Sequence, residues 1–181
     1  MLKVIGEYWA AVIFPLLLVF ASLFIVKDWK NWRYYYPTIL FTIGVSLVVS
    51  VLTYEHWLWY FHKALFIPNH TLNDLWINFT QFPLICFMFL SRYPYKSRWL
   101  MQAAYTSIWA VITSLIEGVF VILQCTTYHN GWNWGWSVLF WFVTFPTLRL
   151  HHSKPFFAWL VFVISAMLVI PYFHIPITQL K

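Results

Sequence analysis

The stretch that decides the fold is residues 99–125, WLMQAAYTSIWAVITSLIEGVFVILQC. A transmembrane helix needs about 20 predominantly apolar residues, and this run is longer than that. Its one carboxylate, Glu117, interrupts an otherwise apolar sequence. A charged side chain at such a depth costs about 2.5–3.5 kcal/mol, so it usually faces other helices or a hydrated cavity. Glu117 is therefore the first candidate functional residue.

The other polar residues of this run follow a helical period. Spacings of four, seven, four and seven separate Gln102, Thr106, Thr113, Glu117 and Gln124. Such spacings place side chains on one face of a helix. We predict that this polar stripe lines a partly hydrated cavity. The alternative is that Glu117 only joins neighbouring helices by hydrogen bonds.

Composition extends the membrane interpretation to the whole chain. Hydrophobic residues make up 62% of the sequence and charged residues 9%, whereas soluble domains carry about 25% charged residues. The sequence therefore predicts an all-α, polytopic integral membrane protein, a helical bundle with six transmembrane helices in one domain, residues 1–181. The spans are predicted at 5–26, 37–61, 75–91, 99–125, 133–149 and 156–175.

Basic residues mark the orientation of these spans because they concentrate in alternate connections. The second connection holds only Lys63 and the fourth holds none, whereas the first, third and fifth hold Lys27, Lys30, Arg33, Arg92, Lys96, Arg98, Arg149 and Lys154. Positive loops stay in the cytoplasm, so both termini of this cell-membrane protein are predicted to be extracytoplasmic. The same dispersal of a net charge of +6 argues against a nucleic-acid partner. The lipid bilayer is the expected partner, and a membrane-protein partner or a homo-oligomer remains open.

This orientation gathers acids and imidazoles toward the outer side. We predict a ligand site whose interior is lined by Glu117, Gln102, Thr113 and Gln124, and whose rim is formed by Glu55, His62, Asp74 and His129. Histidine and carboxylate ligands suit zinc, iron or manganese. No HExxH motif fixes a metal geometry, so a metal site is an alternative only and no cofactor is assigned.

Two local predictions concern the rim. A helix that continues to residue 61 would place Glu55, Trp59 and His62 on one face, and the hydroxyl residues from Thr38 to Thr53 are predicted to pack on the fourth span. The tryptophans of residues 126–137 are predicted to anchor the fifth span at the membrane interface. The alternative is an aromatic lid that turns His129 toward Glu117.

The middle of the chain resembles a family of small multi-span membrane proteins from endospore-forming Firmicutes that has no established activity. The resemblance is carried, in order, by Asp74, Phe82-Pro83-Leu84, Tyr93–Tyr95, Gln102, Glu117 and Gly131-Trp132-Asn133-Trp134. It implies a bacterial cytoplasmic membrane and a sporulating host. It also implies that Glu117 and the tryptophan-rich loop belong to one recurring arrangement.

Three functions follow from these observations. The first is a binding or transport-type role, or a subunit role in a membrane complex, centred on the cavity around Glu117. The second is an intramembrane enzyme, metal-dependent or acid–base, in which Glu117 acts with His62 or His129. The third is a structural role in the envelope or spore membrane, in which the polar stripe only holds helices together.

Overall fold

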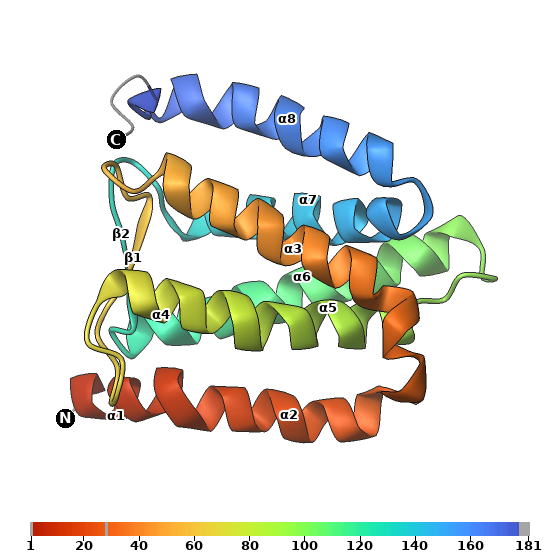
Figure 1. Cartoon of the computed structure of the whole chain (residues 1–181), viewed down its shortest axis with the longest axis horizontal. Coiled ribbons are helices and arrows are strands. Elements are labelled where there is room, and N and C mark those ends of the chain that lie inside the picture. The colour runs from red at the N-terminus through yellow and green to blue at the C-terminus, as the bar shows by residue number, and fades with distance from the viewer. Residues whose placement is uncertain (1, 28, 178–181) are drawn as a thin grey trace.

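The chain folds into six helical rods that run side by side (Figure 1). The structure is a computed structural model, and it describes residues 2–27 and 29–177. Leu2, where α1 begins, and Tyr172, where α8 ends, lie at the same end of the bundle. The rods are α1 (Leu2–Tyr8), η1 (Trp9–Ile13) and α2 (Phe14–Ile25); η2 (Trp29–Asn31) and α3 (Trp32–Leu52); α4 (His70–Trp76), η3 (Ile77–Gln81) and α5 (Phe82–Ser91); α6 (Trp99–Ile122); α7 (Trp134–Ser153); and α8 (Pro155–Tyr172).

A short β-ribbon is the exception to the helical architecture. Strand β1 (Trp59–Phe61) pairs antiparallel with β2 (Thr126–Tyr128), with Trp59 opposite Tyr128 and Phe61 opposite Thr126. The ribbon ties the α3–α4 connection to the α6–α7 connection at one end of the bundle, called the ribbon end below. The all-α class is confirmed for the remainder of the described chain.

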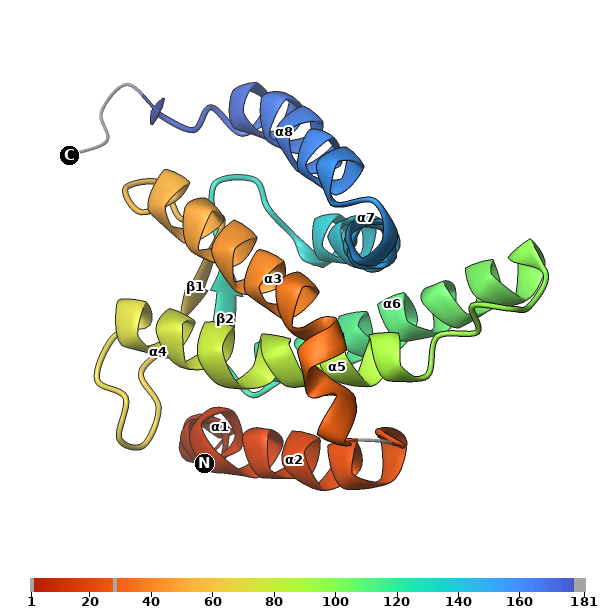
Figure 2. The same cartoon turned by 45° about the vertical axis from the view of Figure 1, so that its right-hand side comes forward.

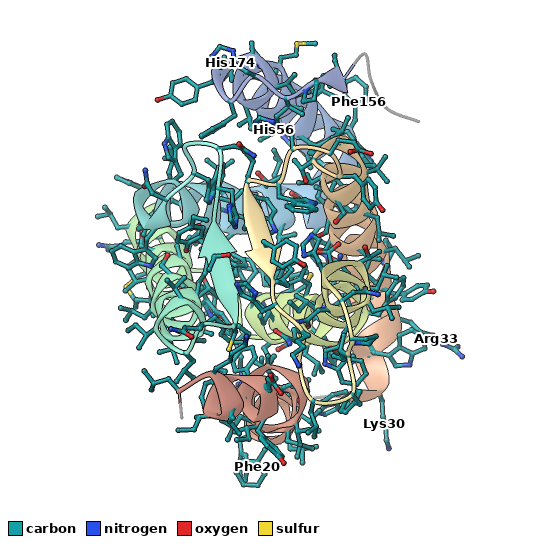
Figure 3. All side chains as sticks on the ribbon, turned by 90° about the vertical axis from the view of Figure 1, so that its left-hand side faces the viewer. Phe20, Lys30, Arg33, His56, Phe156 and His174 are labelled. Carbon is teal, nitrogen blue, oxygen red and sulfur yellow. The ribbon has the colours of Figure 1, made fainter. Side chains whose placement is uncertain are left out.

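Four rods are long and apolar enough to cross a membrane: Leu2–Ile25, Trp29–Leu52, Trp99–Ile122 and Pro155–Tyr172. Their outward faces are apolar as well. Phe20 on α2 and Phe156 on α8 project away from the bundle and are 61% and 70% exposed (Figure 3). The α4–α5 rod and α7 carry more polar residues, so the predicted count of six crossings goes beyond what helix length and apolarity show.

The helices pack in a different order from the predicted one. Helix α3 lies across α5, with α7 and α8 on its other side (Figure 2). It packs mainly on α5 and α7, whereas α6 packs mainly on α7. The prediction that the hydroxyl face of the second span packs on the fourth span is therefore wrong. Thr38 instead reaches α7, where its Oγ1 lies 3.0 Å from His151 Nδ1.

Two rods contain a π-helical turn, and each turn ends at a Phe-Pro pair. The backbone N–H of Phe14 donates to the carbonyl of Trp9, and that of Phe82 donates to the carbonyl of Ile77. Proline has no N–H, and its ring collides with the carbonyl four residues earlier. Widening the preceding turn to a five-residue hydrogen bond relieves this conflict without ending the rod.

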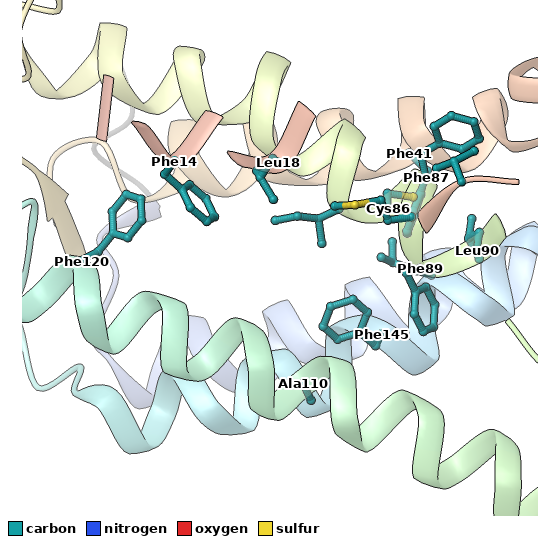
Figure 4. Close-up of a cluster of buried hydrophobic side chains, with 14 of the residues drawn as sticks. Phe14, Leu18, Phe41, Cys86, Phe87, Phe89, Leu90, Ala110, Phe120 and Phe145 are labelled. Atoms are coloured by element: carbon teal, nitrogen blue, oxygen red, sulfur yellow. The ribbon is translucent and has the colours of Figure 1, made fainter. Parts of the chain in front are cut away.

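The core is aromatic and lies between the rods (Figure 4). Phe89 and Phe145 are completely buried, and their ring centroids lie 4.8 Å apart, so α5 and α7 meet through them. Phe14 on α2 and Phe120 on α6 meet edge to face with centroids 5.1 Å apart. Such aromatic pairs contribute roughly 0.5–1.5 kcal/mol beyond the burial of their area.

Two predicted helix ends are wrong. Helix α3 ends at Leu52 rather than at residue 61, and Trp59 lies in β1. The predicted helical face of Glu55, Trp59 and His62 therefore does not exist. Helix α6 ends at Ile122, so Gln124 lies beyond the helix that was predicted to carry it, in the left-handed backbone region at a φ of 59°.

Candidate functional site

A cavity of about 230 Å³ lies between the rods. It extends from the β-ribbon to the middle of the bundle, and side chains of α3, α6, α7 and α8 form most of its wall. The wall is mostly apolar. Three of its rings, Phe14, Phe82 and Phe145, each precede a proline, so the three Phe-Pro pairs of the chain all contribute to one space.

Glu117 lines this cavity and is held by two neutral donors. Tyr128 on β2 donates its hydroxyl to Oε1 at 2.8 Å, and Trp141 on α7 donates its indole N–H to Oε2 at 2.7 Å. Each carboxylate oxygen thus accepts one hydrogen bond from a neutral group. Burial, opposed in part by Ser137 and aided by Glu117, raises the pKa of Tyr128 well above its usual range. Tyr128 therefore stays protonated and remains a donor.

Asp74 is the second carboxylate on the cavity wall. The hydroxyl of Ser50 on α3 donates to its Oδ2 at 2.5 Å. Asp74 is four residues from the start of α4 and Glu117 five residues from the end of α6, roughly 6 Å and 8 Å along the helix axes. Both helix ends adjoin the ribbon, so both acids belong to the ribbon end of the cavity.

No lysine or arginine among the described residues pairs with these acids, and His70, four residues before Asp74, interacts with it electrostatically without forming an ion pair. No ion pair joins Asp74 or Glu117 to a lysine, arginine or histidine in residues 2–27 and 29–177, where the recorded pair links Lys63 to Glu7 at 3.9 Å. Among the residues that line the cavity, none is lysine, arginine or histidine. The ribbon end of the cavity is therefore an electronegative pocket with an apolar continuation.

Two further polar groups on the wall have no partner among the described residues. Gln81 is 4% exposed and its Nε2 makes no hydrogen bond, while Thr126 is 2% exposed and its Oγ1 makes none. A buried polar group without a partner costs about 1–3 kcal/mol. By contrast, Thr113 lines the cavity but donates to the Trp109 carbonyl of its own helix at 2.8 Å.

Two of the four predicted interior residues line the cavity and two do not. Glu117 and Thr113 line the cavity, but Gln102 lies near the other end of α6, where it accepts from Tyr93 and donates to the Ser97 carbonyl. Gln124 is exposed and does not line the cavity.

One of the four predicted rim residues lines the cavity and three do not. Asp74 lines the cavity, whereas Glu55 is exposed in the turn after α3. His62 and His129 meet near the ribbon through Thr127, whose Oγ1 lies 3.2 Å and 2.9 Å from their Nε2 atoms. Burial, with smaller contributions from Lys3 and His129, lowers the pKa of His62. Neither histidine lines the cavity.

The alternative of a metal site requires several ligand side chains that lie close together. Within residues 2–27 and 29–177, no three side chains of His, Cys, Asp or Glu lie close enough to hold a metal ion together. The bridging of His62 and His129 by a hydroxyl is a hydrogen-bond arrangement, because Thr127 can donate one proton and accept another.

The tryptophan-rich loop contributes one ring to the cavity wall. Trp132 is 7% exposed, lines the cavity and donates its indole N–H to Ser137 Oγ at 2.9 Å. Asn133 caps α7 by accepting from the Trp136 backbone N–H. The contact with Glu117 comes from Tyr128.

Sequence reasoning did not identify three of the groups that define the site: Trp141, Tyr128 and the orphaned amide of Gln81. Trp141 is one of 13 tryptophans, and nothing in its local sequence sets it apart. Gln81 carried a usable signal, because a glutamine in the apolar run from Leu75 to Ser91 needs a partner or a cavity.

Together these features define a class: a helical-bundle protein with membrane-length apolar helices and an internal cavity that carries two carboxylates. No family model matches the chain, and no curated protein or solved structure proved similar to it. Since a fold alone does not define a function, the chemistry of the site is what indicates the role of this protein.

Proposed function

We propose that this chain is an integral membrane protein that binds a small, largely apolar ligand in the cavity. The observation that carries the proposal is the cavity of about 230 Å³, which is walled by side chains from the ribbon and most of the rods. Ligand sites in helical bundles are concave, mostly apolar and equipped with a few converging polar groups. A binding or transport-type role in a membrane follows, with entry from the ribbon end.

In this proposal all six rods cross the bilayer and the ribbon end faces outward. The charge pattern of the connections supports this orientation, and it puts both termini on the outer side. The resemblance to membrane proteins of endospore-forming Firmicutes supports a bacterial cell membrane. An alkaline phosphatase fused after residue 181 should be active in a bacterial host, and an inactive, stably expressed fusion would contradict the orientation.

The binding test uses a matched pair of α3 variants. Val45 lines the cavity, whereas Val48 is 41% exposed and does not. Val45→Phe should fill the cavity and abolish binding of 4-phenylbutan-1-ol to protein in lipid nanodiscs, measured by calorimetry. Val48→Phe, which adds the same atoms on the outer face of α3, should bind as the parent does. Equal binding by both variants would contradict the cavity as the site.

A second candidate function is structural, and the bonding of Glu117 favours it. Glu117 joins α6 to β2 through Tyr128 and to α7 through Trp141, which is what a residue that only holds helices together would do. Glu117→Gln keeps the shape and removes the charge. A lowered melting temperature together with an unchanged ligand affinity would favour the structural role of Glu117 over ligand binding.

A further inference from the structure

We propose that the ligand of this cavity is an organic monocation: an apolar amine that also carries a hydrogen-bond acceptor oxygen. This inference rests on the proposed function and specifies the ligand class for the same site. Asp74 and Glu117 supply negative charge, the wall around them is aromatic, and Gln81 supplies an unused donor deeper in the cavity.

The two carboxylates select the charge of the ligand. Both lie in the ribbon end of the cavity, and all of their described hydrogen bonds come from the neutral donors Ser50, Tyr128 and Trp141. Those donors stabilise the acids without neutralising them. Both carboxylates are half-buried, and a charge in an apolar site gains from a partner of opposite sign. His70 interacts electrostatically with Asp74 but does not line the cavity. A protonated amine between the two helices would supply such a partner.

The aromatic wall selects the body of the ligand. Trp59, Phe61 and Phe120 line the cavity beside the acids, and an ammonium group is attracted to the faces of such rings. Farther from the ribbon the wall consists of Phe41, Phe145 and Leu148, which offer only apolar contact. An ammonium head at the ribbon end with an apolar body beyond it matches this gradient.

Gln81 indicates the acceptor. It follows Asp74 by seven residues on the same rod, roughly 10 Å deeper along the axis. Its Nε2 lacks a partner although the side chain is 4% exposed, and it belongs to the π-helical turn η3. Such turns are frequent at functional sites. A carbonyl, ether or hydroxyl oxygen on the ligand would satisfy this donor.

The test compares two probes that share a phenylbutyl body and differ in the head group, an ammonium in 4-phenylbutylamine and a neutral hydroxyl in 4-phenylbutan-1-ol. Calorimetry is performed on the full chain in nanodiscs of zwitterionic lipid at neutral pH, with Val45→Phe as the background for partition into lipid. The amine should bind at least about tenfold more tightly than the alcohol. Asp74→Asn should remove that preference, whereas Glu55→Gln, the same change at an exposed site, should preserve it.

Each outcome supports or overturns the charge selection or the proposed binding function. If the alcohol binds as tightly as the amine, the charge selection is overturned and the apolar binding site stands. If neither probe binds above the Val45→Phe background, the proposed function and this inference fail together. Should Asp74→Asn not fold, the ratio of the two affinities in the unmodified chain still settles the charge selection. The donor is tested by Gln81→Leu, which should weaken the binding of 4-phenoxybutan-1-amine, an amine with an ether oxygen, more than the binding of 5-phenylpentan-1-amine, in which a methylene replaces that oxygen.

Discussion

The indole N–H of Trp141 donates to Glu117 Oε2 at 2.7 Å and so joins α6 to α7 beside the cavity. The two residues are separated by 24 positions in the chain and meet because α6 and α7 pack against each other along their lengths. Tyr128 binds the other oxygen, so the acid is fixed from two elements at once.

Trp141→Phe keeps most of the ring and removes this donor. Hydrogen bonds to charged groups contribute about 1.5–3 kcal/mol, so the free energy of unfolding should fall by that amount. The measurement is a denaturant titration in detergent that follows helical circular dichroism. Trp99→Phe is the matched control, because Trp99 is 73% exposed and its loss should leave stability unchanged.

Thr38→Val tests the link between α3 and α7. Thr38 is 1% exposed and its hydroxyl bonds His151 at 3.0 Å, so the isosteric valine should cost about 1 kcal/mol or somewhat more. Thr144→Val makes the same change where the hydroxyl returns to the Phe140 carbonyl of its own helix. Equal unfolding midpoints for the two variants would show that the hydrogen bond between Thr38 and His151 does not stabilise the fold.

Gly6→Ala should destabilise the chain, because an added Cβ would collide with the Leu123 carbonyl and press on Cys125 Sγ. Overpacking of this kind costs about 1–3 kcal/mol. At Gly44, in the middle of α3, a Cβ would meet nothing within 4 Å. Gly44→Ala should therefore gain about 0.5–1 kcal/mol from helix propensity. Opposite shifts in melting temperature are expected, and a stabilised Gly6→Ala would contradict the packing of α1 on the end of α6.

Lowering the pH should reduce the stability of the folded chain through His62, which lies near the ribbon. Burial lowers the pKa of His62 below its ordinary value of 6.5, so below that pH the unfolded chain binds more protons at this site than the folded chain. The stability associated with His62 is complete above 6.5 and decreases as the pH falls through and below it. Melting temperatures between about pH 8 and pH 5 should show this fall, and His62→Asn should reduce it. A slope unchanged by His62→Asn would assign the effect to other groups.

The positions of the helices could be predicted from the sequence because each of the six rods coincides with an apolar run bounded by polar or charged residues. The end of α3 could not be predicted in this way. Residues 53–61 are rich in aromatic side chains, as the helices are, yet they form turns and a strand. A short apolar run does not distinguish these states by its period. Only the pairing of Trp59 with Tyr128, far apart in sequence, reveals the strand.

For the site, the cost of burying a charge identified Glu117, whereas Asp74 became a candidate through the charge-based orientation of the spans. Helical spacing then assigned residues to the cavity beyond both of its ends. Spacing shows which face of a helix a residue occupies, but it does not show how far along the helix the cavity extends. Gln102 lies on that face but beyond the cavity, and Gln124 lies past the last helical turn. The partners Trp141 and Tyr128 depend on how α6, α7 and the ribbon pack, which local sequence does not encode.

Helix α8 is attached at its ends rather than along its length. At one end it follows α7 through Lys154 and Pro155, and at the other Phe173 and Ile175 pack with Leu58 and Trp132. Between these points Ala158 is its one fully buried residue, although Val161, Phe162 and Ser165 line the cavity. α8 is thus a strap across the side of the bundle. Because α8 supplies the wall on this side, release of its contacts with Trp132 would uncover the cavity at the side of the bundle, while the hydrogen bonds that join α3, α6 and α7 stay in place.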